Sequence, residues 1–380
     1  MRLLHSSDWH LGRLFHGIHL TDDQAIILDQ FIDIAKEFSP DAIIIAGDIY
    51  DRSVPPPEAI NLLDEVLSKL LLDVKIPIFI IAGNHDGPDR LGFASRLLQK
   101  QGLYIFSYPE LHLKPVTLQD KFGPVDIFPI PFARPERVRS LIDEPEIKNH
   151  QQAMSALMDR VDFSENKRRV AISHSFVTGG STTESETPLS VGGSEMISVD
   201  NFDNFSYVAL GHLHKVQSFR DDKIHYSGSL MKYSFSEVNH QKSVSLVELD
   251  EHGNTKIERI PLVPKRDLRC LKGTLDEIVQ HSGDDAAKDD YLMVTLTDSE
   301  PIFDAMGKLR QVYPNVMHIE RPIYSVNPRE IGLSQKQRKM NDSDLFESFY
   351  KQIMPSDISP AQKEFFAKIA DSLMQEQREA

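Results

Sequence analysis

Residues 42–51 read Ala-Ile-Ile-Ile-Ala-Gly-Asp-Ile-Tyr-Asp, a short apolar run that leads into two carboxylates. A continuous run rich in isoleucine, without polar alternation, is typical of a strand buried on both faces of a sheet. Asp48 follows this run almost directly, and Asp51 lies three residues further on. In open α/β sheets, ligands bind at the carboxyl ends of the strands. The stretch therefore predicts an α/β fold with Asp48 at the end of a buried strand.

The same pattern occurs four more times in the first part of the chain. The runs cover residues 2–5, 76–82, 169–173 and 207–210, and polar residues follow each one. Because the carboxyl ends of such strands gather along one edge, we expect these polar side chains to meet there. The candidate ligands are Asp8, His10, Asp48, Asn84, His174, His212 and His214, with His85 directly after Asn84.

These side chains indicate a centre of two divalent cations. Read singly, each is explained as a turn residue or a satisfied polar group, but their repeated position after an apolar run favours metal binding. Carboxylate, amide and imidazole ligands suit a pair of transition-metal ions, with Asp48 as the natural bridge. Such a pair activates water near neutral pH and stabilises charge in an in-line displacement at phosphorus. The sequence thus predicts phosphoester hydrolysis.

The charge balance bears on the substrate. The formal net charge is −15, which argues against a protein that wraps nucleic acid through a basic surface. A carboxylate-rich metal site is itself acidic before cations bind, and a partner subunit can supply phosphate contacts. Nucleic acid therefore stays open as a substrate.

The sequence also bears on the compartment. We find no apolar run of the roughly 20 residues that cross a bilayer and no readable secretory signal at the first residues. The single cysteine, Cys270, excludes an internal disulfide and a thiolate zinc cluster. We expect a cytoplasmic protein.

Periodicity predicts the surrounding elements. Residues 24–38 and 58–72 have helical spacing and are expected to cover the sheet. Residues 244–249 and 256–262 are expected to pair as a hairpin. Residues 178–197 are rich in Gly, Ser and Thr, and we interpret them either as a mobile surface segment or as a substrate or partner loop beside the site.

We divide the chain into a catalytic domain (1–263), a small α/β domain (264–326) and a polar tail (327–380). The first boundary follows Pro261 and precedes Pro264, and the small domain repeats strand and helix patterns from residue 268. The tail contains two short amphipathic helix candidates, which need a surface to bury their apolar faces, either on this protein or on a partner. Those faces comprise Leu345, Phe346, Phe349 and Ile353, and Phe365, Phe366, Ile369 and Leu373.

The ordered motifs resemble those of the calcineurin-like metallophosphoesterase family. They run Asp8-x-His10, Gly47-Asp48-x-x-Asp51, Gly83-Asn84-His85-Asp86, His174 and Gly211-His212-x-His214. The resemblance implies a sandwich of two sheets flanked by helices. It also implies two metal shells, the first formed by Asp8, His10, Asp48 and His214 and the second by Asp48, Asn84, His174 and His212.

The same resemblance implies roles in catalysis. His85 would contact the scissile phosphate and assist the leaving oxygen as an acid. Asp51 would orient His85, although it is also explained as a cap for the following segment. Arg52 and Arg90 are candidate phosphate contacts.

A narrower resemblance is to the bacterial DNA nucleases of this family. It rests on Met1–Gly12, Gly47–Arg52, Gly83–Asp86 and the Val191–Gly193 loop, and it extends to about Glu320. It implies a small capping domain and tail helices that dock on the coiled-coil base of a partner ATPase. The implied activity is manganese-dependent endonuclease and exonuclease action, with the ATPase controlling work on duplex ends and hairpins in DNA repair, replication and recombination. The implied assembly is a homodimer within a heterotetramer.

Relatives of these nucleases in archaea and eukaryotes carry one further substrate-contacting histidine. His16 lies nearest to the corresponding position, and His19 is the alternative.

Two other functions fit part of the pattern. A small-molecule metallophosphoesterase, such as a cyclic-nucleotide phosphodiesterase or a nucleotidase, uses the same ligands, but the two tail helices disfavour it. A catalytically dead scaffold would lack ligands, whereas every motif position here is filled.

Overall fold

The computed structural model describes residues 1–163, 166–186, 195–321, 346–347, 350–351, 354 and 358–379. It divides into two compact units, Met1–Leu268 and Arg269–Ala380. The predicted boundary after residue 263 lies five residues before this division and stays a prediction. Within the described part of the chain, none of the helices combines the length and apolarity that a bilayer crossing requires.

The first sheet of the larger unit has β1 (Arg2–Ser6) at its centre. β1 pairs in parallel with β4 (Ala42–Ile45) and antiparallel with β15 (Ser243–Leu249). The strand order is β16-β15-β1-β4-β5-β6, in which β16 is Thr255–Pro261, β5 is Ile78–Ile81 and β6 is Leu103–Phe106. β15 and β16 form the predicted hairpin.

The second sheet has β12 (Tyr207–Gly211) and β9 (Arg169–His174) as parallel neighbours at its centre. Its order is β13-β14-β12-β9-β8-β7, with bounds Gln217–Phe219, Ile224–Tyr226, Tyr207–Gly211, Arg169–His174, Gly123–Ile130 and Val116–Asp120. A separate pair, β10 (Phe176–Val177) and β11 (Met196–Ile197), flanks residues 178–195, of which 187–194, including the Val191–Gly193 motif, lie outside the described residues.

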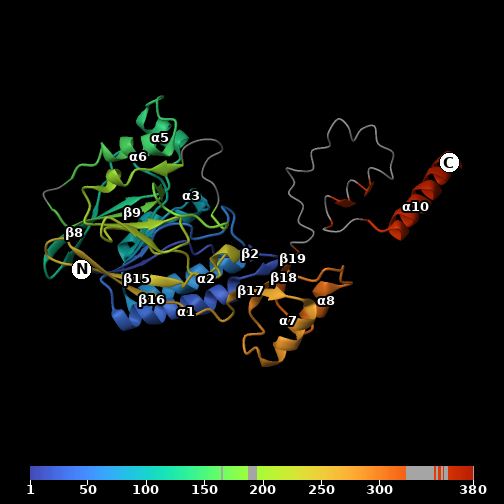
Figure 1. Cartoon of the computed structure of the whole chain (residues 1–380). Helices are drawn as coiled ribbons and strands as arrows, with labels where there is room; N and C mark the ends of the chain where they lie inside the picture. Colours follow the sequence, from blue (N-terminus) through green and yellow to red (C-terminus); the bar gives the residue numbers. More distant parts are fainter. Residues whose placement is uncertain are drawn as a thin grey trace. The chain divides into compact units, whose positions relative to one another are not determined.

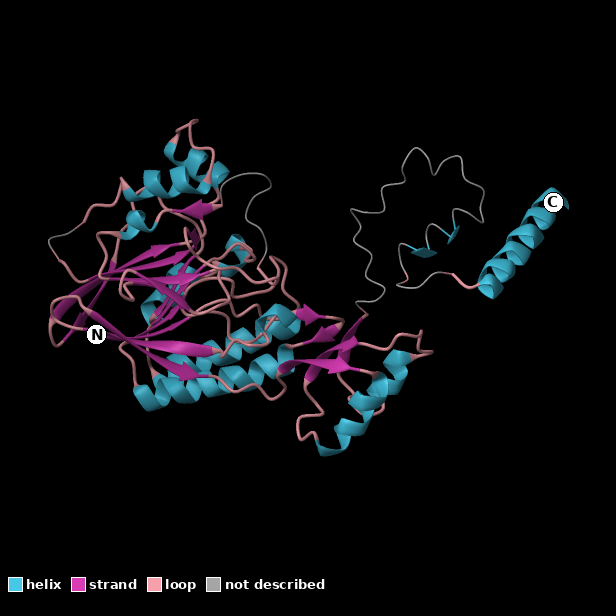
Figure 2. Ribbon diagram, viewed as in Figure 1, coloured by secondary structure: helices cyan, strands magenta, loops and turns pink. Residues whose placement is uncertain are grey.

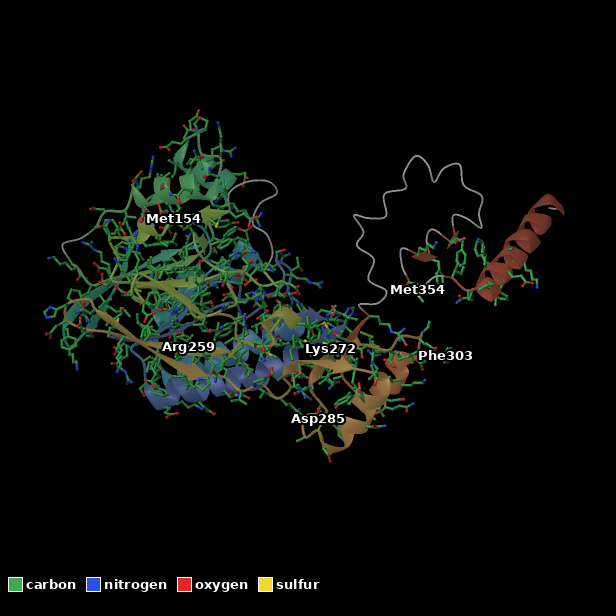
Figure 3. All side chains as sticks on the ribbon, in the orientation of Figure 1. Met154, Arg259, Lys272, Asp285, Phe303 and Met354 are labelled. Carbon is green, nitrogen blue, oxygen red and sulfur yellow. The ribbon has the colours of Figure 1, made fainter. Side chains whose placement is uncertain are left out.

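The two sheets pack face to face through fully buried apolar side chains. Leu3, Ile44 and Phe79 come from the first sheet and join Val170 and Tyr207 from the second in one cluster. A second cluster covers the outer face of the second sheet and includes Met154 from the helix α6 (His150–Met158; Figure 3). The predicted two-sheet sandwich of the α/β class is therefore confirmed.

Helices cover both outer faces of the sandwich, as Figures 1 and 2 show. On one side lie α1 (Thr21–Phe38) and α2 (Pro57–Ser68), which continues as a π-helical turn, η1 (Lys69–Val74). On the other side lie α5 (Pro135–Ile142) and α6 (His150–Met158). α1 begins three residues before its predicted start, where Asp22 and Asp23 favour the positive end of the helix dipole.

The remaining short elements connect these layers. They are β2 (Leu14–Phe15), β3 (Ile18–His19), α3 (Pro88–Leu91), α4 (Ser95–Leu98), and the 3-10 helices η2 (Gln99–Gln101), η3 (Val199–Phe202) and η4 (Phe235–Glu237).

The smaller unit contains a three-stranded sheet of order β17-β18-β19. Its elements are β17 (Leu268–Gly273), α7 (Leu275–His281), η5 (Ser282–Asp284), β18 (Tyr291–Leu296), α8 (Ala305–Arg310) and β19 (Val316–Glu320). A capping box between Thr274 and Glu277 begins α7, and Ile278, Val294 and Leu309 share one core. These contacts form the repeated strand and helix arrangement that the sequence predicts.

The tail contains a long helix, α10 (Pro360–Glu379). Phe366 on α10 stacks on Phe346 with ring centroids 3.9 Å apart, whereas Phe365 and Ile369 are 68% and 44% exposed. Part of the predicted apolar surface therefore packs within the tail and part faces outward. Leu345, Phe349, Ile353 and the side chain of Leu373 lie outside the described residues.

A buried arginine, Arg168, joins the sheets at the end opposite the strand termini that carry the candidate ligands. Arg168, just before β9, donates two hydrogen bonds of 2.8 and 2.6 Å to the carboxylate of Asp120 on β7. Its Nε donates to the carbonyl of Asp250, which directly follows β15. Arg168 thus connects the second sheet to the β15–β16 turn of the first.

We predict that Arg168→Met lowers the free energy of unfolding by about 1–3 kcal/mol, because it removes two charge-assisted hydrogen bonds from the Asp120 carboxylate, which keeps the Met1 ammonium as its remaining ionic partner. Urea unfolding followed by circular dichroism measures this change. Lys69→Met is the matched control. Lys69 pairs with the exposed carboxylates of Asp29 and Glu65, so its loss should change the free energy of unfolding by at most about 1 kcal/mol. Equal effects of the two substitutions would contradict the prediction.

Candidate metal centre

The candidate ligands meet where five strands from both sheets end. Asp8 and His10 follow β1, Asp48 follows β4, and Asn84 and His85 follow β5. His174 is the last residue of β9, and His212 and His214 follow β12. All seven predicted ligands therefore lie at one site. Six are at least 97% buried, and Asn84 is partly exposed.

One group of ligand atoms comprises Asp8, His10 and His214, all within 4.8 Å of one another. The Nε2 atoms of His10 and His214 face each other at 3.1 Å. Two imidazole nitrogens bound to one cation at about 2.0–2.1 Å each have this kind of separation. The pair therefore fits a shared metal ion.

A second group surrounds the side-chain oxygen of Asn84. Its Oδ1 lies 2.9 Å from His174 Nε2 and 3.1 Å from His212 Nδ1. His174 Nδ1 donates to the carbonyl of Ala46 at 2.9 Å, which leaves the Nε2 lone pair directed at the site. An amide oxygen and two imidazole nitrogens at these distances are a ligand set that fits a second cation.

Asp48 connects the two groups. Its Oδ2 lies 3.4 Å from His174 Nε2 and 3.7 Å from His10 Nε2, while its Oδ1 accepts the backbone N–H of His85 at 2.9 Å. Burial alone would raise the pKa of Asp48, but the imidazoles of His174 and His10 hold that pKa well below the usual range. An ionised oxygen between two sets of nitrogen ligands is suited to bridge two divalent cations.

The backbone is strained at four of the candidate ligands. Asp8, His10, Asp48 and His212 have φ angles of 53°, 46°, 50° and 101°, a region that residues other than glycine rarely adopt. Asp86 connects the loop after β4 to the loop after β5, because its carboxylate accepts hydrogen bonds from the backbone N–H groups of Ile49, Tyr50 and Gly83. Burial and the charge of Asp48 raise the pKa of Asp86 to about 6. These contacts hold the ligand loops in conformations that they would not adopt alone.

Comparisons with known proteins place this site in a family. The model of the calcineurin-like phosphoesterase family matches residues 1–216, and that of the Type 5 capsule protein repressor C-terminal domain matches residues 264–353. The chain is 35% identical over 366 residues to the SbcD subunit of the SbcCD nuclease of Staphylococcus epidermidis, covering 96% of each chain. It is 36% identical over 379 residues to the protein of the same name from Staphylococcus saprophyticus, covering 99% of each.

The chain belongs to the SbcD nucleases of the calcineurin-like phosphoesterase family. The resemblance found in the motifs is thereby confirmed. The chain is a metal-dependent phosphodiesterase, and the groups of candidate ligand atoms described above fit the divalent metal ions that its family uses.

Solved structures give more distant matches. They include TT1561 of Thermus thermophilus, with 16% identity, a TM-score of 0.38 and coverage of 68% of this chain and 98% of that one. A hypothetical protein from the same organism has 12% identity, a TM-score of 0.36 and coverage of 69% and 100%.

His85 lies at the open side of the SbcD centre. It is partly exposed, unlike the buried histidine ligands, and its ring lies edge-on to His10 with centroids 4.8 Å apart. Its Nδ1 donates to the backbone carbonyl of Asp51 at 2.8 Å, which leaves Nε2 for a substrate. The Asp51 carboxylate is engaged elsewhere, at 2.7 Å from Arg13 and 3.6 Å from His10 Nδ1. Asp51 therefore accepts a hydrogen bond from His85 through its carbonyl, while its carboxylate and the ring nitrogens of His10 and His85 form a third group of potential ligand atoms within 4.8 Å of one another.

The predicted substrate contacts are all exposed side chains. Arg52 is exposed and approaches the Asp51 carboxylate at 3.7 Å. Arg90 is exposed on α3 and donates to the carbonyl of Ser53. His16 is exposed in the β2–β3 turn and lies against Phe235, while His19 is exposed on β3. Their roles stay predictions.

Sequence reasoning missed four residues around His214. They are Ser185, Glu186, Glu237 and Lys242, which contact its side chain or backbone directly or through one another. Only the polar composition of residues 178–197, following His174, signalled that part of this set is near the site.

Gly83 shows how closely the SbcD ligand loops pack. A Cβ at this position would lie 2.1 Å from Asp48 Oδ1 and 2.4 Å from the Asp48 nitrogen. We predict that Gly83→Ala displaces Asp48 and weakens both metal positions together, because Asp48 is common to them. Calorimetric titration of the metal-free protein with Mn²⁺ measures both affinities.

Gly283→Ala is the control, because a Cβ there meets no atom within 4 Å. Retention of both affinities in Gly83→Ala would show that Asp48 is not the shared ligand.

Proposed function

We propose that this SbcD chain cuts DNA as the nuclease subunit of a complex with an SbcC-type ATPase, using two Mn²⁺ ions. The observation that supports it most directly is the position of Asp48 Oδ2 between His10 and His174. The names of the Staphylococcus relatives support the nuclease activity and the SbcC partner. Hairpins, duplex ends and single strands are the proposed DNA substrates, with ATP controlling work on duplex DNA.

The proposed ligand sets follow the two groups of atoms. Asp8, His10, Asp48 and His214 hold one cation, and Asp48, Asn84, His174 and His212 hold the other. When bound, the two cations activate water and neutralise charge on the phosphoryl oxygens. Mn²⁺ suits this mixture of carboxylate, amide and imidazole ligands, which also accepts Fe, Zn or Co.

We assign His85 as the acid that assists the leaving oxygen. The Asp51 carbonyl fixes its Nδ1 proton, so the Nε2 proton of the imidazolium is the one available for transfer. Arg52, Arg90 and His16 are proposed to contact the DNA backbone. We keep a small-molecule phosphoesterase as the second candidate function, because it would use the same ligands.

We predict that the purified chain cleaves single-stranded or hairpin DNA with Mn²⁺ and that EDTA abolishes cleavage. His85→Ala should lower kcat by about 10²–10⁴-fold, because the leaving oxygen loses its acid. Gel assays on labelled hairpins measure the rate, and calorimetry checks that the variant still binds Mn²⁺.

His252→Ala is the matched control, because His252 is an exposed histidine in the turn between β15 and β16. Failure of the wild type on every form of DNA, with efficient hydrolysis of a cyclic nucleotide, would favour the second candidate.

The regions beyond residue 263 carry the proposed partner contacts. We assign residues 264–326 as a capping domain and 327–380 as a linker and docking helices for SbcC. Two SbcD chains are proposed to form a homodimer within a heterotetramer. The single Cys270 supports a cytoplasmic location.

The exposed apolar side chains of α10 give a test of docking. We predict that Phe365→Ala combined with Ile369→Ala lowers affinity for the ATPase at least tenfold, because both side chains are available for burial against a partner. Size-exclusion chromatography and calorimetry with the purified ATPase measure this loss.

Phe303→Ala is the control, because Phe303 is 90% exposed in the smaller unit (Figure 3) but lies outside the tail. Unchanged affinity in the α10 double variant would exclude this helix as the docking site.

A further inference from the structure

His214 is held at three points by residues outside the proposed ligand set. Ser185 Oγ lies 2.6 Å from its Nδ1, and Glu186 Oε1 accepts its backbone N–H at 2.8 Å. Lys242 Nζ donates to its backbone carbonyl at 2.9 Å. Ser185 and Glu186 belong to the segment between β10 and β11, whereas Lys242 precedes β15. Two distant parts of the chain therefore hold the His214 backbone, and Ser185 contacts its imidazole.

A fully buried ion pair supports these contacts. The Glu237 side chain is 0% exposed, and its Oε2 accepts a hydrogen bond of 2.5 Å from Lys242 Nζ. Lys242 uses its other two donors on Ser229 Oγ and the His214 carbonyl. A buried ammonium that has all its donors satisfied, with its counter-charge adjacent, is held in one position.

Ser185 links this pair to the imidazole. Its hydroxyl donates to Glu237 Oε1 at 2.6 Å, so its lone pair is available to accept the Nδ1 proton of His214. The chain of donors runs from His214 through Ser185 to Glu237. It fixes the tautomer in which His214 Nε2 carries a lone pair and faces His10 Nε2.

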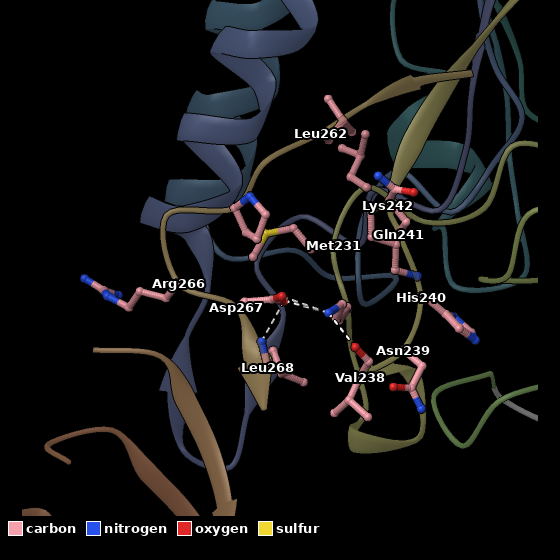
Figure 4. Close-up of a pocket in the computed structure, with 13 residues that line it drawn as sticks. Met231, Val238, Asn239, His240, Gln241, Lys242, Leu262, Arg266, Asp267 and Leu268 are labelled. Carbon is pink, nitrogen blue, oxygen red and sulfur yellow. Dashed lines mark hydrogen bonds and ion pairs between the residues drawn. The ribbon is translucent and has the colours of Figure 1, made fainter. Parts of the chain in front are cut away.

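Lys242 and the residues that follow Glu237 border a pocket of about 180 Å³ (Figure 4). Lys232, His240, Lys242 and Asp267 are among its lining residues. Lys232 pairs with Asp267 and donates to the carbonyl of Val238, next to Glu237. These contacts fasten the segment that carries Glu237 independently of Ser185.

We propose that residues 183–186 form a latch in which Glu237 acts through Ser185 as a positioning residue for His214, tuning metal affinity at the Asp8–His10–His214 position. The inference rests on the metal assignment of the proposed function. Docking of the latch and metal binding at this position then favour each other by the same factor. Occupancy of the site thereby becomes sensitive to anything that moves residues 183–186.

Calorimetric titration of the metal-free, full-length chain with Mn²⁺ tests the latch. Ser185→Ala should weaken one of the two metal positions by about 10–100-fold and leave the other unchanged, because only His214 loses its partner. Ser185→Thr keeps the hydroxyl and should restore most of the affinity. Ser181→Ala is the matched control, because Ser181 is in the same segment but bonds to Gln217.

Hydrogen exchange gives a second readout that needs neither DNA nor catalysis. Mn²⁺ should slow amide exchange at residues 181–186 in the wild type, and this slowing should be lost in Ser185→Ala. Unchanged affinities in Ser185→Ala, equal losses at both positions, or metal-independent exchange in the wild type would each overturn the latch. A chain that shows the latch but cuts no DNA would instead count against the proposed function alone.

Discussion

The Oδ2 atom of Asp48 is the point at which the two halves of the centre meet. It faces His10 on one side and His174 on the other, and these residues come from different sheets. β1, which leads to His10, and β9, which ends at His174, must therefore keep a fixed relative position across the sandwich for one oxygen to lie between the two groups of ligands. The apolar core shared by the two sheets and the hydrogen bond from Arg168 to the Asp250 carbonyl hold the sheets together, while the three hydrogen bonds to Asp86 fix the loops after β4 and β5 within the first sheet.

The residues around Asp48 Oδ2 combine backbone strain with burial of charged side chains. The four ligand residues with positive φ angles would relax if the loops were free, and the buried carboxylates would be costly without nearby cationic or hydrogen-bonding partners. The protein meets these costs with close packing, which leaves no room for a methyl group at Gly83. Preorganisation of this kind lets the ligands receive cations without a large rearrangement.

Much of the centre was predictable because its residues follow buried strands. The run before Asp48 and the one before His174 each identified a strand, and the geometry of α/β sheets placed their ends together. Ser185 and Glu237 were not predictable in this way, because 52 residues separate them and neither follows an apolar run. Asp51 shows a subtler limit, since the family resemblance implied that it orients His85 without saying through which atom, and in the structure its carbonyl accepts the hydrogen bond. Patterns in sequence locate side chains on elements, but tertiary packing decides which atom of a residue is used.

The distribution of the centre over two sheets also affects the chain during its synthesis. β1, β4 and β5 leave the ribosome well before β9 and β12, and until those later strands pair, Asp48 lacks the imidazole of His174. An incomplete chain consequently carries no assembled hydrolytic centre.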